Sequence, residues 1–190
     1  MTEFRRGFKT EANTIAREIR EELGLRPVDP LDPWKLANHL AIPIFTLRHF
    51  ADEAPKAYKL FRDSEEEAFS AVTVFYGSVR LIVHNEFHAR VRQASNLAHE
   101  ISHALLLHPP MLAFDALGCR NWNEELENEA NWLAGALLIS EEAALQIARD
   151  GIDFEYASAK YGVSQKMVQF RLNVTAAYMR IKRERRNYQK

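Results

Sequence analysis

The chain has 190 residues but only a single cysteine, Cys119, and that scarcity is the first limit on its chemistry. One cysteine cannot form an internal disulfide, and it cannot build a cysteine-rich zinc site. Any metal ion would therefore be held by histidine, glutamate or aspartate side chains.

Long apolar runs and an excess of one charge are also missing. No stretch approaches about 18 continuous apolar residues, the length that crosses a bilayer as a helix. The first ten residues carry charges and no apolar segment, so we expect no signal peptide and a cytoplasmic location. The net charge of -1 gives no overall attraction to nucleic acid.

Helical periodicity dominates what is present. The segment 48–67 gives a mixed signal, and the acidic run at its end, Asp63, Glu65, Glu66 and Glu67, is typical of a solvated loop. Apolar residues at helical or alternating spacing, with capping residues beside them, predict the remaining elements. Helices are expected at 10–23, 33–40, 86–108, 124–139 and 141–149, and strands at 42–47, 68–75 and 79–84. We therefore expect an α+β fold that is mostly helical, with a small sheet.

The chemistry concentrates in the sequence H-E-I-S-H at positions 99–103. Residues four apart on a helix lie one turn up the same face, so His99 and His103 can bind one metal ion together. Glu100 lies roughly 100° further round, where it can reach a water on the metal without binding the ion itself. Two imidazoles, an open coordination position and a carboxylate base are what metal-assisted peptide hydrolysis needs.

A catalytic zinc also needs a third protein ligand. His108 follows His103 by five positions, roughly 140° around a continuing helix, so we do not expect it on the same ion. Glu127 and Glu129, in the next predicted helix, flank its apolar stripe on opposite sides. Either carboxylate could approach the ion, and periodicity does not choose between them.

These residues resemble a known family. The sequence H-E-I-S-H, followed 26 residues after His103 by Glu129 within E-N-E-A-N-W-L-A-G-A-L-L, resembles the ImmA/IrrE family of zinc metallopeptidases. The family motif is H-E-x-x-H and then roughly E-x-E-A-N-x-F-A-x-x-L-L-x-P. Two positions depart from it: Leu133 stands where Phe is usual, and no proline follows Ile139. Neither position is a ligand.

The resemblance implies a zincin-like metallopeptidase domain, which we place at residues 1–150. It implies His99, His103 and Glu129 as zinc ligands and Glu100 as the general base. Glu129 is preferred because it precedes Ala-Asn as the family's glutamate does.

Two alternatives to that ligand set stay open. Glu127 is the second choice for the third ligand, because it stands four residues before Asn131 in a ligand-and-support spacing. Mn²⁺ or Fe²⁺ would suit the same side chains as zinc.

The resemblance also implies a substrate. Family members are similar in cleaving a partner helix-turn-helix transcriptional repressor, which relieves repression after stress. We expect such a protein substrate here, with a peptidase acting on general peptides as a minor alternative.

Residues 151–190 form the second predicted unit. Phe154 to Gly162, followed by a helix capped by Ser164, resembles a helix-turn-helix, and the end of the chain is rich in Arg and Lys. The segment either packs as two more core helices on the same domain or contacts phosphates. The alternative function is therefore a DNA- or protein-binding regulator with a structural or vestigial zinc site.

Overall fold

The computed structural model describes residues 4–63, 69–77, 79–109 and 123–187. Within these residues the chain is mostly helical with a small three-stranded sheet, which confirms the α+β expectation. The elements follow one another as α1 (Phe8–Glu22), α2 (Pro33–His39), β1 (Ile44–Thr46), the short 3₁₀ helix η1 (Leu47–Phe50), α3 (Pro55–Asp63), β2 (Ala71–Tyr76), β3 (Val79–His84), α4 (Arg90–Leu105), α5 (Glu124–Leu138), α6 (Glu141–Asp150), α7 (Phe154–Tyr161), α8 (Gln165–Val174) and α9 (Ala177–Asn187).

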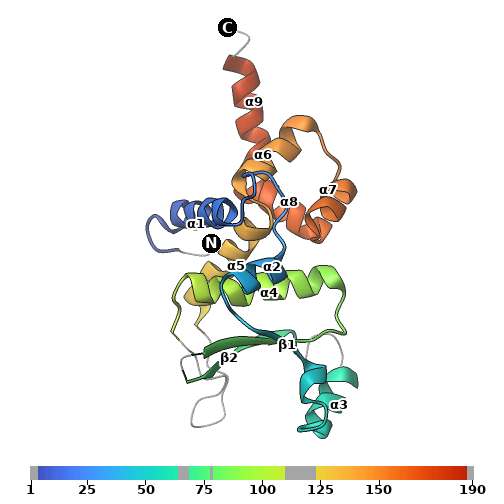
Figure 1. Cartoon of the computed structure of the whole chain (residues 1–190). Helices are drawn as coiled ribbons and strands as arrows, with labels where there is room; N and C mark the ends of the chain where they lie inside the picture. The colour runs from blue at the N-terminus through green and yellow to red at the C-terminus, as the bar shows by residue number, and fades with distance from the viewer. Residues whose placement is uncertain (1–3, 64–68, 78, 110–122, 188–190) are drawn as a thin grey trace.

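The sheet has the order β1-β3-β2. β1 runs parallel to β3, with Ile44 opposite Ile82, and β2 is antiparallel to β3, with Thr73 opposite Ile82. Figure 1 shows α4 crossing the sheet, with α1, α2 and α5–α9 beyond it and α3 on the sheet side. Among the strands that the structure describes, β2 therefore forms one edge of the sheet and contacts α4, which carries the histidines.

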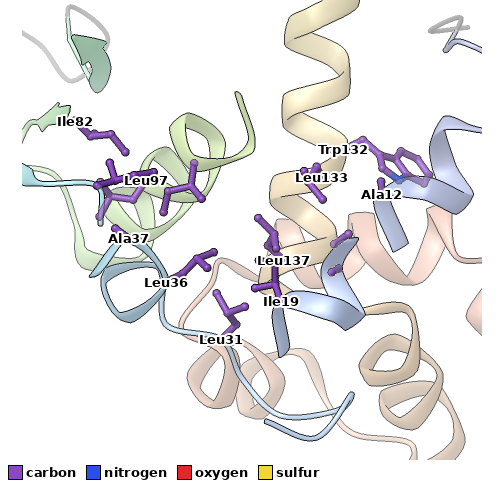
Figure 2. Packing of buried hydrophobic residues seen from close by; sticks show 14 of the residues in the cluster. Ala12, Ile19, Leu31, Leu36, Ala37, Ile82, Leu97, Trp132, Leu133 and Leu137 are labelled. Atoms are coloured by element: carbon purple, nitrogen blue, oxygen red, sulfur yellow. The ribbon is translucent and has the colours of Figure 1, made fainter. Parts of the chain in front are cut away.

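Helix α5 is the centre of the packing. Nine of its residues are buried, and they face two directions. Leu133 and Leu137 join a cluster with Ala12 and Ile19 of α1, as Figure 2 shows. On another side, Leu138 packs with residues of α6–α9 in a second cluster, which also contains Ala98 of α4. The division predicted at residue 150 stays a prediction.

Two buried arginines hold the carboxyl end of α5. Arg20 donates from its Nη2 to the carbonyl of Leu137 at 2.7 Å, and Arg171 donates from its Nε to the carbonyl of Ile139 at 2.8 Å. The last carbonyls of a helix lack partners within the helix and carry partial negative charge, so a cation there is favourable. Burial lowers the pKa of both arginines to about 10, so both remain charged at neutral pH.

Most local predictions are confirmed. Asp32, Ser140 and Ser164 each accept a hydrogen bond from a backbone N–H in the first turn of the helix that they precede. Within the segment 48–67, where the sequence signal was mixed, the chain forms the end of η1 and all of α3. The loop predicted for the acidic run falls at residues 64–67, outside the described residues, apart from Asp63, which ends α3. Helix α4 is also shorter than expected at both ends. No helix of the described ranges is long and apolar enough to span a membrane.

The cap at Ser140 gives a test of this packing. Its hydroxyl accepts from the N–H of Ala143 at 3.0 Å and donates to the carbonyl of Pro27 at 2.5 Å, with the side chain buried. We expect Ser140→Ala to lower the free energy of unfolding by about 1–3 kcal/mol in urea denaturation. Ser164→Ala removes an exposed cap without a buried second bond, so its loss should be smaller. Equal losses would contradict this account.

Candidate metal centre

Helix α4 presents two histidines on the side away from its core residues. Leu97 and Ile101 are fully buried in the main cluster, whereas His99 and His103 are only partly covered. The two Nε2 atoms lie 3.1 Å apart, and the rings are nearly perpendicular. His99 and His103 therefore lie together on one face of α4, as predicted from their spacing.

Helix α5 brings a carboxylate to the same point. Glu127 Oε2 lies 3.1 Å from His99 Nε2, and Glu127 Oε1 lies 3.6 Å from His103 Nε2. One ligand atom from each residue lies within 4.8 Å of the others. Ligands around a tetrahedral zinc, with bonds of about 2.0 Å, are separated by about 3.3 Å. The three side chains therefore have the chemistry and the spacing of a divalent metal site.

The outward ring nitrogens are also held. Nδ1 of His99 lies 3.0 Å from Asn131 Oδ1, and Nδ1 of His103 lies 2.9 Å from His108 Nδ1. An N–H on His99 Nδ1 donates to the amide oxygen, which leaves the lone pair on Nε2 for a metal. Ligating histidines are commonly held in this way.

Glu129, the third ligand preferred from the family motif, lies elsewhere. Its side chain is 5% exposed, with Oε2 at 3.4 Å from His108 Nε2 and Oε1 at 2.9 Å from Arg5 Nε. Residues two apart on a helix are roughly 200° apart around it, so Glu127 and Glu129 cannot face one ion from the same helix. The geometry favours Glu127, as the spacing from Glu127 to Asn131 had allowed.

Glu100 lies beside the metal group and contacts the sheet. The Thr73 hydroxyl of β2 donates to Glu100 Oε2 at 2.5 Å. Burial raises the pKa of Glu100 above its ordinary value, although the hydrogen bond from Thr73 and the nearby His99 act in the opposite direction. A carboxyl group with a raised pKa is better matched to proton transfer near neutral pH. No sequence pattern points to Thr73, because only the folded sheet brings it to α4.

The histidine pKa values differ in direction. Burial and the neighbouring His99 lower the pKa of His103 to about 4, so its ring is neutral at physiological pH. For His99, burial alone would lower the pKa, but Glu127, the charge of Glu100 and the hydrogen bond with Asn131 together outweigh it, and the pKa is raised. A metal ion binds only the neutral ring, so protonation of His99 would compete with metal binding.

The opposite face of the sheet is apolar. A cavity of about 440 Å³ lies between α3 and the strands, lined by side chains that include Tyr58, Val72, Val74 and Val83. Thr73, between the two valines of β2, reaches Glu100 on α4 instead. Thr73 therefore faces the metal group, while its neighbours Val72 and Val74 face the apolar cavity.

A model of the IrrE N-terminal-like domain, Peptidase_M78, matches residues 42–173. The match covers more than half of the chain and includes β1 to α8, with all of the metal group. It confirms the resemblance drawn from the H-E-x-x-H and E-x-E-A-N motifs. A search of curated proteins finds no match.

The position of Glu127 gives a direct test. After loading with Zn²⁺ and removal of excess ion, we expect about one zinc per chain in the wild type and a loss of that zinc in Glu127→Ala. The measurement is elemental analysis of the purified proteins. Glu124→Ala is the matched control, because Glu124 is exposed in the same first turn of α5. Full zinc occupancy in Glu127→Ala would exclude this carboxylate as a ligand.

Proposed function

Because the chain belongs to the IrrE N-terminal-like family of metallopeptidases, we propose that it is a zinc-dependent endopeptidase. The observation that carries the proposal is the convergence of His99, His103 and Glu127 on one point, with Glu100 beside them. Two imidazoles and one carboxylate leave a coordination position open, as catalytic zinc sites require.

The proposed ligands are His99, His103 and Glu127, with Asn131 orienting the first of them. A divalent ion held there supplies Lewis acidity, which polarises a scissile carbonyl and lowers the pKa of a water molecule. Zinc is the proposed ion because imidazole and carboxylate ligands in this number suit it, although Mn²⁺ and Fe²⁺ accept the same ligands.

Glu100 is the proposed general base. It accepts a proton from the attacking water and then passes that proton to the leaving amine. Thr73 holds one of its carboxylate oxygens from β2, which fixes the direction of the carboxylate relative to the histidine pair. Burial raises the pKa of Glu100. The higher pKa makes its carboxylate a better acceptor for the proton of the attacking water.

The substrate is proposed to be a protein, and a helix-turn-helix transcriptional repressor in particular. The family resemblance supports the repressor, and cleavage would relieve repression in the cytoplasm. Among the described residues β2 is an edge strand, which supports an extended substrate segment, because a sheet edge can pair with an added peptide strand. Thr73 lies on that edge strand, so a segment paired with β2 would run close to Glu100.

The alternative function, a DNA-binding regulator, stays a prediction. Two arginines of its basic C-terminal segment make contacts within the chain. Arg180 pairs with Glu141, and Arg185 donates to the carbonyl of Arg149 at 3.1 Å. Salt-dependent binding to duplex DNA that is lost on changing Gln165 and Lys166 would favour this alternative.

The role of Glu100 can be tested separately from metal binding. Glu100→Gln keeps the shape of the side chain but cannot accept a proton, so we expect it to retain zinc and lose cleavage by about 10²–10⁴-fold. The assay follows new peptide termini by mass spectrometry, with helix-turn-helix repressors and a general peptide library as substrates.

Two further variants serve as controls for Glu100→Gln. His103→Ala should lose both zinc and cleavage, and Glu125→Gln, an exposed change on α5, should keep both. If Glu100→Gln cleaves at the wild-type rate, Glu100 is not the base.

A further inference from the structure

We propose that His108 and Glu129 are positioning residues that hold His103 toward the metal ion, with Arg5 completing the support. The inference rests on the proposed metal site and adds to it a set of residues that bind no metal themselves. It gives Glu129 a role other than the direct ligation that the family motif implied.

The two ring nitrogens of His103 point to different partners. Its Nε2 faces His99 and Glu127, while its Nδ1 lies 2.9 Å from His108 Nδ1. A neutral imidazole carries one proton, and Nε2 needs its lone pair for a metal. The proton of His103 therefore belongs on Nδ1, from which it donates to His108 Nδ1.

The same reasoning fixes the proton on His108. Because its Nδ1 accepts from His103, its Nε2 carries the hydrogen, and that atom lies 3.4 Å from Glu129 Oε2. The His108 and Glu129 side chains are only 6% and 5% exposed. A buried carboxylate is costly unless it is paired. His103 thus donates to His108, and His108 donates to Glu129. This series favours the His103 tautomer with its proton on Nδ1, which leaves Nε2 free to bind a metal ion.

The backbone is bent where His108 needs to be. Helix α4 ends at Leu105, and Leu107 has a φ of 54°, in the left-handed region. That conformation is unfavourable for a residue other than glycine, and the Leu107 side chain is left 85% exposed. The bend returns His108 to His103, with its N–H donating to the His103 carbonyl at 3.0 Å. A continuing helix would have carried His108 away.

Arg5 comes from the far end of the chain. Its Nε lies 2.9 Å from Glu129 Oε1, and its other guanidinium nitrogens bind Glu11 at 2.6 and 2.9 Å. Phe4 packs against Trp132 of α5, which keeps the segment in place. Arg5 supplies positive charge to a buried carboxylate, and it lies outside residues 42–173 that match the family. This part of the support therefore belongs to the chain's own N-terminal segment.

The proposal is tested by metal affinity rather than by cleavage. We would measure Zn²⁺ affinity by competition with a chromophoric chelator, and the visible spectrum of the Co²⁺-loaded protein, which reports ligand geometry. Glu129→Gln and His108→Phe keep the approximate volume of the side chain and remove the carboxylate or the ring acceptor. We expect each to weaken zinc binding about 10–100-fold and to shift the Co²⁺ spectrum.

Three comparisons make the effect specific. Glu125→Gln, which changes an exposed carboxylate of the same helix, should match the wild type in both measurements. His108→Asn retains an acceptor near His103 and should recover part of the affinity lost in His108→Phe. The double variant of Glu129→Gln and His108→Phe should bind little worse than either single variant, because the two side chains act in one series.

The outcomes separate this inference from the proposed function. Wild type that binds no zinc overturns both. Wild-type affinity and spectrum in Glu129→Gln and His108→Phe overturn only the support. If Glu129→Ala loses zinc completely while Glu127→Ala keeps it, Glu129 is the ligand and the support is also overturned.

Discussion

The packing of α4 against α5 is the contact on which the whole site depends. Helix α4 supplies the two histidines and the base, whereas α5 supplies Glu127, Asn131 and Glu129. Each helix buries its apolar face in the shared core, so its polar residues meet at one place. The arginines at the carboxyl end of α5 fix that helix further, because they bind its last carbonyls from α1 and α8. The geometry of the metal group is therefore a consequence of core packing.

Charge is distributed around the centre in layers. The inner group places two imidazoles beside the Glu127 carboxylate, and a bound metal ion would add positive charge there. Further out, Glu129 Oε1 lies 2.9 Å from Arg5 Nε, and the same guanidinium also binds Glu11. Glu127 and Glu129 are two residues apart, yet they face different partners and have different chemistry. Glu127 lies beside the two histidines of α4, whereas Glu129 lies beside His108, so their surroundings distinguish the candidate ligand from its neighbour.

The sequence predicted the histidine pair, the base and the helix caps because these depend on spacing within one element. It did not decide between Glu127 and Glu129, since that choice depends on where α4 lies against α5. His108 was excluded on the assumption of a continuing helix, and the turn at Leu107 removes that assumption. Helix α3 was missed because it has no buried residue and lies in a highly charged stretch. Arg5 is distant in sequence and became visible only in the fold.

The pairing of α1 with α5 also orders events during synthesis. Phe8, Ala12 and Ile19 of α1 are covered by a cluster that includes α5, which follows more than a hundred residues later. At about 5–20 residues per second, the ribosome leaves that apolar face without its partner for roughly 5–20 seconds. Helix α4 is synthesised during this interval, before α5 supplies the carboxylate that lies beside its histidines. Both the main hydrophobic cluster and the candidate metal group can therefore be completed only after α5 has been synthesised.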